Sequence, residues 1–351
     1  MPPTRVHFNG SVNLPDAETA MREISERIPT GVRRMTDGET GERGNWILFQ
    51  IQKFMAMPEF ELVKVSRPYE TEDDAPAMPQ IKLREGATAD TIQWPDLGYA
   101  DEYGQSFAIF DRMQQDGTIA DGVRFQLQYP TPLASMAVTF VPEDMPAVAA
   151  SYEAALFADV DKAMANMPHD RVAVQWDVAV EFVLLEGGMG MTPVSLEEIV
   201  PALVRAVDQL PADVPVGLHL CYGDYGHQHF QDPESLQMQV DLVNAVVAAA
   251  SRPLNFVSFT VPQARADAEY FAPLSALQAP DTELYFALVP YHPAAQAEGT
   301  TATQIAHVEA VLGEREWGIC TECGMGRVHA EDVPVLLDLH STIIAPATAT
   351  R

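Results

Sequence analysis

Short apolar runs rich in β-branched and aromatic residues alternate with helical patterns along most of this chain. Such alternation is typical of strand–helix units on a parallel sheet. The strands that we predict are residues 5–9, 31–36, 123–128, 171–177, 215–221, 254–260, 283–289 and 316–320. Eight units are what a closed β/α barrel requires, whereas an open doubly wound sheet more often has about five or six strands. The sequence therefore predicts an α/β fold, a single (β/α)8 TIM barrel over residues 1–351.

Several helices have recognisable start signals. Asp16 precedes one predicted helix, and Ser195 ahead of Leu-Glu-Glu forms a capping-box pattern for another. The segment Asp232-Pro233-Glu234 is expected to open a helix that runs to about Ala250. A further helix is predicted from about Arg43 to Met55.

Residues 58–100 interrupt the alternation. This stretch is acidic and rich in proline, contains ETEDD at 70–74, and has no clean helical period. We interpret it as an insertion in the second unit, with a hairpin around residues 60–65. No internal repeat and no linker of the kind that separates domains is visible, so one domain is expected.

Charge and cysteine content exclude several classes of protein. The formal net charge is −29, which repels nucleic-acid backbones and anionic lipid. No apolar run approaches the roughly 18 residues that a membrane span needs, and the N-terminus has no apolar signal region. The three cysteines are too few for a disulfide framework. We therefore expect a soluble, cytoplasmic protein with reduced thiols and a small-molecule substrate; the oligomeric state is left open.

Polar residues that could bind a substrate or take part in catalysis follow nearly every predicted strand. In β/α barrels the active site lies at the C-terminal ends of the strands, so these residues are candidates for substrate binding or catalysis. The candidate substrate-binding residues are Asn9, Ser11, Asp37, Glu39, Arg43, Asp177, Glu181 and Tyr291.

A His-x-Cys pair ends the fifth strand. His219 and Cys221 are two residues apart on a strand, so their side chains share a face and can bind one metal ion. Cys320 and Cys323 form a CxxC after the eighth strand and could supply a third ligand. The alternative is buried cysteines at strand ends with a histidine bonded to backbone. Because both motifs fall at strand ends of one barrel, we favour the metal site.

Four motifs together resemble a known family. DGE with a following Arg after the second strand, HLCYGD after the fifth, PYHP after the seventh and ECGMGR after the eighth are similar, in order, to the catalytic half of cobalamin-independent methionine synthase and the related uroporphyrinogen-decarboxylase-like barrels. The resemblance implies a zinc ion that binds a thiol substrate as thiolate for alkylation, so a thiol and a methyl or alkyl donor are the expected partners. His219, Cys221 and Cys323 resemble the zinc ligands, with Cys323 preferred because a glycine follows it directly.

The same resemblance assigns the acid–base residues. Glu39 and Asp177 resemble the acidic residues that hold the amino group of the thiol substrate, and His292 resembles a histidine that assists proton transfer at the donor. These residue types suit the roles, because carboxylates bind ammonium groups and histidine titrates near neutral pH. For the carboxylates, helix capping is an equally good interpretation, and His292 lies between two prolines as a turn residue would.

Two features depart from the family pattern. Methionine synthases have a further zinc-binding glutamate at the end of the sixth strand, where this chain has Thr260, a poor zinc ligand. The family's folate donor is polyanionic and fits poorly with a chain of net charge −29. His227 and His229, just beyond the metal pair, could be additional ligands, although a solvent-facing loop is the interpretation that we favour.

Three functions stay open from the sequence. The first is a zinc-dependent transferase that activates a thiol or water in a barrel mouth roofed by the 58–100 insertion and the 187–193 loop. The second is a metal-independent lyase, decarboxylase or ether-cleaving enzyme that uses Glu39, Asp177 and His292 as acid–base groups. The third is a non-catalytic barrel that binds a ligand or a metal.

Overall fold

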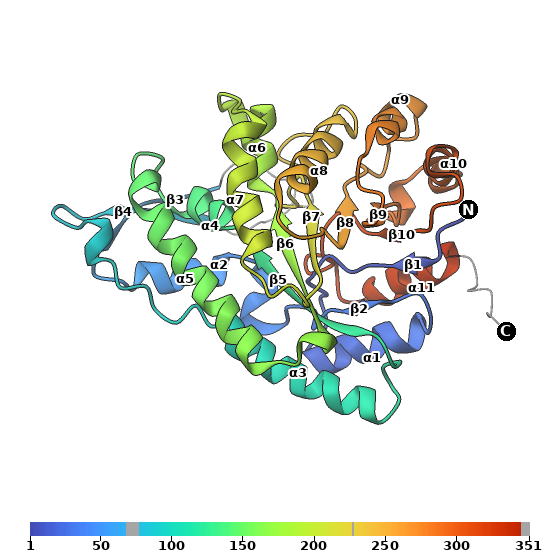
Figure 1. The fold of residues 1–351 in the computed structure, drawn as a ribbon, viewed down its shortest axis with the longest axis horizontal. Coiled ribbons are helices and arrows are strands. Elements are labelled where there is room, and N and C mark those ends of the chain that lie inside the picture. The colour runs from blue at the N-terminus through green and yellow to red at the C-terminus, as the bar shows by residue number, and fades with distance from the viewer. Residues whose placement is uncertain (68–76, 227, 345–351) are drawn as a thin grey trace.

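The computed structural model describes residues 1–67, 77–226 and 228–344. ETEDD at 70–74 and His227 lie outside the described residues. Across the described residues, the main sheet contains eight parallel strands (Figure 1). They are β1 (Arg5–Val6), β2 (Arg34–Met35), β5 (Arg124–Pro130), β6 (Val172–Val178), β7 (Val216–Leu220), β8 (Phe256–Phe259), β9 (Glu283–Ala287) and β10 (Trp317–Cys320).

The sheet curls into a barrel. Its spatial order is β1-β10-β9-β8-β7-β6-β5-β2. Val6 of β1 forms a parallel bridge with Val32, just before β2, and its backbone N–H donates to Gly31 O at 3.0 Å. The first and last strands of the order are therefore neighbours, which closes the ring. The predicted (β/α)8 fold is confirmed, with all eight strands in the predicted places, although β1 and β2 are shorter than expected.

The barrel strands are buried on both faces. Every residue of β6 is buried, as expected of a parallel strand covered by helices. Trp176 and Trp317 are fully buried, which agrees with a core role for both. The covering α-helices of the described chain are α1 (Ala17–Arg27), α2 (Leu48–Met55), α3 (Tyr99–Gln115), α4 (Pro132–Thr139), α5 (Met145–Asn166), α6 (Val180–Glu186), α7 (Leu196–Asp208), α8 (Gln237–Ala249), α9 (Ala268–Phe271), α10 (Thr300–Leu312) and α11 (Val333–Ile343).

Two of the predicted helix starts are confirmed. The Asp16 carboxylate caps α1 by accepting from Thr19 N at 2.8 Å. Ser195 and Glu198 form the predicted capping box of α7. Both caps satisfy backbone N–H groups that the first helical turn leaves without partners.

Two other helix predictions are wrong in their bounds. Helix α8 begins at Gln237 because Asp232 pairs with His229, at 2.7 Å, instead of capping a helix. The predicted helix over residues 43–55 is split into a 3-10 turn (Gly41–Asn45) and α2, with Trp46 at φ 52° between them. A positive φ cannot continue a helix, so the chain turns there.

The insertion is a hairpin packed on the outer helices. Strands β3 (Phe60–Ser66) and β4 (Met78–Leu83) pair antiparallel and lie away from both termini (Figure 1). A hairpin is therefore present, but it is longer than predicted, since residues 60–65 form only its first strand. Val141 N donates to Ile81 O at 3.0 Å. The rings of Phe60 and Phe140 pack edge to face at 4.9 Å. These contacts attach the hairpin to the segment that joins α4 and α5.

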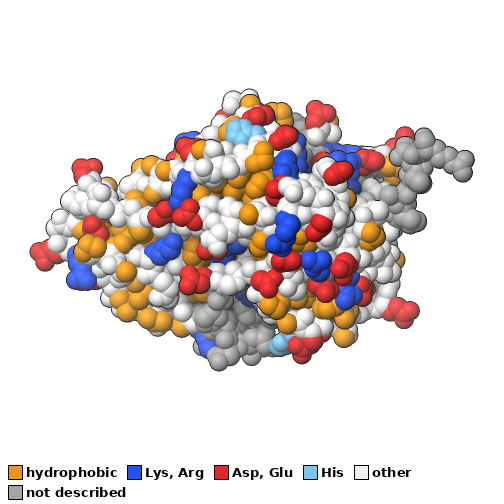
Figure 2. Space-filling view, turned by 90° about the horizontal axis from the view of Figure 1, so that it is seen from below, with side chains coloured by type: hydrophobic (Ala, Val, Ile, Leu, Met, Phe, Trp, Pro, Cys, Tyr) orange, Lys and Arg blue, Asp and Glu red, His pale blue; other side chains and the backbone are white. Residues whose placement is uncertain are grey.

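The surface agrees with the charge of the chain. On the face shown in Figure 2, Lys and Arg side chains are scattered among acidic and apolar ones, so the described part of this face has no continuous basic surface. Within the described residues, no helix has both the length and the apolar character that crossing a membrane requires.

Candidate metal centre and substrate cavity

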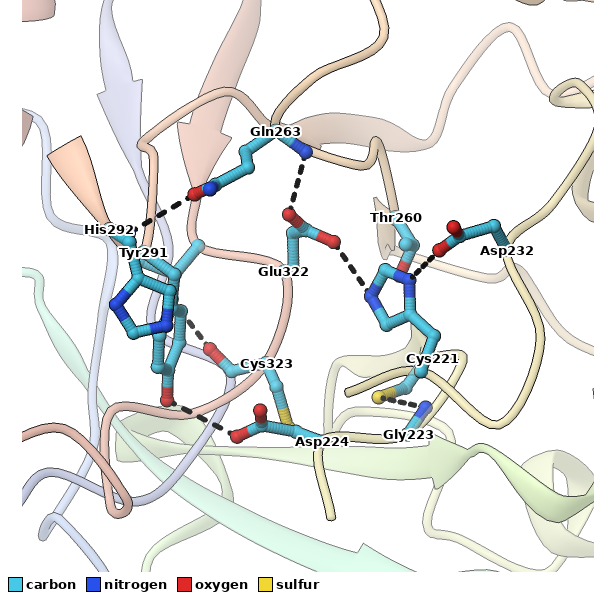
Figure 3. A network of polar contacts seen from close by, with 12 residues as sticks. Cys221, Gly223, Asp224, Asp232, Thr260, Gln263, Tyr291, His292, Glu322 and Cys323 are labelled. Carbon is cyan, nitrogen blue, oxygen red and sulfur yellow. Dashed lines mark hydrogen bonds and ion pairs between the residues drawn. The ribbon is translucent and has the colours of Figure 1, made fainter. Parts of the chain in front are cut away.

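Three predicted metal ligands converge at the C-terminal end of the barrel. His219 lies in β7, Cys221 follows it, and Cys323 follows β10. Their ligand atoms all lie within 4.8 Å of one another, and the two cysteine side chains extend toward the same region (Figure 3). Strands β7 and β10 are not neighbours in the sheet, so barrel closure is what brings the third ligand to the first two.

A hydrogen-bond chain sets the orientation of His219. Ser258 Oγ donates to Asn9 Oδ1 at 2.8 Å, and Asn9 Nδ2 donates to Thr321 O at 2.7 Å. Because the single hydroxyl hydrogen of Ser258 is donated to Asn9, Ser258 Oγ can only accept from His219, whose protonated Nδ1 lies 3.0 Å away. In the neutral imidazole, Nε2 then carries a lone pair. That atom is buried and has no hydrogen-bond partner among the described residues, which is the state required of a metal ligand.

The position of Cys323 depends on a close approach of two loops. Met325 N donates to Ser11 O at 2.6 Å. A Cβ at Gly324 would lie 2.4 Å from Ser11 Oγ and 2.8 Å from Ser11 N, so only glycine fits after Cys323. The glycine that follows the cysteine in the motif therefore has a packing role at the site.

The other cysteine of the CxxC does not join the cluster. Cys320 is buried in β10, and burial is the main cause that raises its pKa. For Cys323, the hydrogen bond with Cys221 and then burial raise the thiol pKa. The described group of candidate ligands contains one cysteine from each motif.

Thr260 does not complete the set. Its hydroxyl donates to Leu220 O at 2.7 Å, and its backbone N–H donates to Gln239 Oε1 at 2.8 Å. The described residues at this centre therefore offer one imidazole nitrogen and two sulfur atoms. This set fits zinc in a three-ligand site whose fourth position is open to substrate.

A cavity of about 390 Å³ lies over the three ligands. Its volume is within the range of small-molecule sites. Of the predicted substrate-binding residues, Asn9, Ser11, Glu39 and Asp177 line this cavity together with the ligands. Lys64, Met78 and Gln80 of the insertion and Met189 and Met191 of the 187–193 loop also line it, in agreement with the predicted roof.

Glu39 and Asp177 are buried carboxylates held by specific contacts. Asp177 accepts from Gln175 Nε2 at 2.9 Å and from Trp46 Nε1 at 3.2 Å. Burial raises the pKa of Asp177 to about 6, and the nearby His219 opposes this rise. Burial and the charge of Asp177 raise the pKa of Glu39 well above its usual range. Two carboxylates with raised pKa values beside one cavity favour a cationic ligand group such as ammonium.

Glycine at position 10 makes room for Glu39. Gly10 has φ 132°, and a Cβ there would lie 2.9 Å from Glu39 Oε2. The absence of a side chain lets the first loop pass directly beneath the carboxylate.

Other predicted site residues lie elsewhere. Arg43 and Asp37 form a buried ion pair with each other at 2.5 Å, and neither lines the cavity. Glu181 is buried at the start of α6, and burial raises its pKa to about 7. Contact of these three residues with a substrate stays a prediction.

Tyr291 and His292 line a second cavity of about 450 Å³. It borders the first cavity through Gly223, Asp224 and Cys323 (Figure 3). The structure thus places His292 near the candidate centre but outside the cavity that holds Glu39 and Asp177.

His229 lies in the wall of this second cavity, and the expectation that it faces solvent is wrong. Its Nε2 is 2.7 Å from Glu322 Oε2 and its Nδ1 is 2.7 Å from Asp232 Oδ1. Burial lowers the pKa of His229, but the bonds to the two carboxylates outweigh burial and raise the pKa to about 10. A histidine held between two carboxylates in this way is outside the group of candidate metal ligands.

Sequence reasoning missed some residues of the site. Ser258 is a polar residue within the apolar strand β8, and that irregularity is the signal that could have found it. Gln175 in β6 gives a similar signal, because an amide in a buried strand needs a polar partner. The apolar residues of α4 and α6 that line the cavity gave no signal, since they look like ordinary core residues.

Comparison with known proteins gives similarity of fold. No protein-family profile matches the chain, and no curated protein matches its sequence significantly. Among solved structures, a B12-independent methionine synthase from Shewanella sp. W3-18-1 in complex with selenomethionine is similar at a TM-score of 0.62 and 12% identity, covering 98% of this chain and 97% of that one. A Listeria monocytogenes protein named as a vitamin-B12-independent methionine synthase is similar at a TM-score of 0.56 and 13% identity, with 99% of both chains covered. The chain therefore has the single-barrel fold of these B12-independent methionine synthase structures along essentially its whole length.

Proposed function

We propose that this protein is a zinc-dependent transferase that alkylates a thiol at the His219, Cys221 and Cys323 centre. The observation that carries the proposal is the convergence of three ligand atoms at a substrate-sized cavity, with His219 and Cys221 buried and Cys323 partly buried. Among the described residues, His219 Nε2 has no hydrogen-bond partner. A zinc ion held by these residues would supply positive charge that lowers the pKa of a thiol and keeps it as a thiolate at neutral pH.

The residues around the centre have separate roles in the proposal. Ser258 and Asn9 hold the ring of His219 so that Nε2 faces the other two ligands. Glu39 and Asp177 bind the ammonium group of an amino thiol, and the ligand's charge offsets the repulsion between the carboxylates. The apolar upper part of the cavity excludes water, which makes these charge interactions stronger.

The reaction balances as R–SH + R′–X giving R–S–R′ + H–X. A bond forms between the thiol sulfur and the alkyl carbon, and the bond between that carbon and the leaving atom X breaks. The electron pair of the broken bond leaves with X. The proton given up by the thiol ends on X, and His292 at the adjacent cavity is the candidate for its delivery.

Metal content tests the proposal. Elemental analysis of untagged protein is expected to find about one zinc per chain, strongly reduced in Cys221→Ser and Cys323→Ser. Cys320→Ser is the matched control, because Cys320 is buried like Cys221 and precedes Cys323 by three positions but is not in the ligand group. Equal zinc in all four proteins would place the metal elsewhere, and zinc-free wild type would refute the proposal.

The metal-independent alternative gives an opposite result. A lyase or ether-cleaving enzyme would keep its activity after treatment with a chelator and in Cys221→Ser. Of its three proposed acid–base residues, Glu39 and Asp177 share the main cavity, whereas His292 lines the second one. The non-catalytic alternative predicts ligand binding without turnover across thiols and alkyl donors.

A further inference from the structure

The main cavity has two chemically different parts. Its floor carries the ligands together with Asn9, Ser11, Glu39 and Asp177. Much of the remaining lining consists of apolar side chains from α4, the start of α5, α6 and the loops beyond α6 and β7. They include Ala137, Val138, Met145, Val183, Leu184 and Phe230, which we call the apolar wall.

The ionisable groups that face this cavity are few and mostly acidic. Besides the ligands, the described lining contains Glu39, Asp177, Asp224 and the phenol of Tyr225 as acids and Lys64 and Arg327 as bases. The charge of Arg67 acts on Tyr225 from nearby. Arg327 Nη1 is 3.2 Å from Asp224 Oδ2, so its charge is offset within the protein. Lys64 lies on the exposed hairpin strand β3 at the outer edge. The described lining therefore lacks a cluster of cations of the kind that binds a polyanion.

The rim of the cavity is also apolar, because Met189 and Met191 lie there. Met189 and Met191 are 51% and 42% exposed although both line the cavity. Methionine side chains are flexible and polarisable, and they adapt to apolar ligands of different shape. An apolar molecule would thus meet apolar side chains from the rim to the wall.

From these features we infer that the alkyl donor is a small apolar molecule without anionic groups, bound with its body on the apolar wall and its alkyl carbon toward the metal floor. The inference rests on the proposed function, since it assigns the second substrate of that same site. Burial of apolar surface on the wall favours such a donor, whereas an anionic group there would lose its hydration without gaining a cationic partner.

The charge selectivity of the wall can be measured without knowing the donor. N-phenyl-1-naphthylamine is neutral, and 8-anilino-1-naphthalenesulfonate has the same ring system with one sulfonate added. In fluorescence titrations of the zinc-loaded protein, the neutral probe is expected to bind at least about tenfold more tightly than the sulfonate. Zinc is measured in every sample.

Three variants locate the binding to the wall. Ala137→Trp fills the cavity beside α4 and is expected to weaken binding of the neutral probe at least about tenfold. Met145→Lys adds a cation to the wall and is expected to reverse or abolish the preference for the neutral probe. Met145→Leu is the size-matched control and should behave as wild type. All three variants are expected to retain zinc, because neither Ala137 nor Met145 belongs to the group of candidate ligands.

The outcomes separate the inference from the proposed function. Zinc-loaded protein that binds the sulfonate as tightly as the neutral probe would overturn the inference and leave the zinc centre intact. The same holds if Ala137→Trp keeps wild-type zinc and wild-type binding of the neutral probe. Protein without zinc would overturn the proposed function, and with it the assignment of the wall to an alkyl donor.

Discussion

Replacement of Ser258 by alanine is expected to weaken zinc binding although Ser258 is not a ligand. The hydroxyl accepts from His219 Nδ1 at 3.0 Å and donates to Asn9 Oδ1 at 2.8 Å. All three side chains are buried, with His219 3% and Asn9 5% exposed. Alanine removes both bonds at once and leaves the imidazole free to change its tautomer or rotate.

The size of the effect follows from these contacts. Loss of an outer hydrogen-bond partner of a metal-binding histidine typically costs about 10- to 100-fold in metal affinity. That range corresponds to about 1 to 3 kcal/mol of binding free energy. Leaving buried polar groups without partners is also expected to lower the free energy of unfolding of the metal-free protein by about 1 to 3 kcal/mol.

Competition with a chromophoric chelator measures the zinc affinity, and urea unfolding of the metal-free protein measures the stability. Histidine ¹⁵N spectra of the metal-free protein give a separate readout, because wild-type His219 is expected to carry its proton on Nδ1. Ser258→Thr keeps the hydroxyl and should restore most of the affinity.

Thr260→Val is the matched control on the same strand end, since the Thr260 hydroxyl bonds Leu220 O rather than His219. If Ser258→Ala binds zinc within about twofold of wild type, which is a negligible free-energy difference, the hydrogen-bond chain does not set the histidine and the reasoning fails. An equal loss in Thr260→Val would show that any change at this strand end disturbs the site.

Two further predictions concern packing and pH. Gly324→Ala is expected to lower zinc affinity about tenfold or more, since the new Cβ would lie 2.4 Å from Ser11 Oγ and shift Cys323. Gly104→Ala is the control and should keep wild-type zinc affinity, because a Cβ at Gly104 would have nothing within 4 Å. Equal zinc affinities in wild type and both variants would contradict the packing argument. Burial raises the pKa of Glu181 to about 7, above its unfolded value, so wild type is expected to lose stability as pH rises from about 4.5 to 7. Glu181→Gln should remove this loss, so its free energy of unfolding is expected to exceed that of wild type by about 3 kcal/mol at pH 8 and to equal it below pH 4. Urea titrations at each pH measure both proteins, and a stability difference that does not change with pH would contradict the prediction.

Much of the candidate site could be predicted from the chain because barrel geometry converts order in sequence into position in space. Once eight strand–helix units are recognised, every residue that follows a strand lies at one end of the barrel. That rule alone brings His219, Cys221 and Cys323 to the same end, across strands that are not neighbours. The alternation of side chains along a strand then puts His219 and Cys221 on one face.

Local patterns could not determine which polar residues face the cavity. Asp37 and Glu39 are two residues apart after the same strand, yet Asp37 pairs with Arg43 in the interior and Glu39 lines the cavity. The CxxC spacing by itself does not choose between Cys320 and Cys323; the resemblance to the family favours Cys323, and Cys323 is the one that joins the cluster. These outcomes depend on partners that lie far away in the sequence.

The barrel and the end of it that carries the candidate site could be predicted from the sequence, because the strand–helix period and the polar strand ends are local properties of the chain. The tautomer of His219, the different partners of Asp37 and Glu39, and the apolar wall over the centre depend on the tertiary structure. The physical reason is that hydrogen-bond partners and cavity walls come from different units. Ser258 and Asn9 are 249 positions apart, and their contact exists only once the barrel has closed.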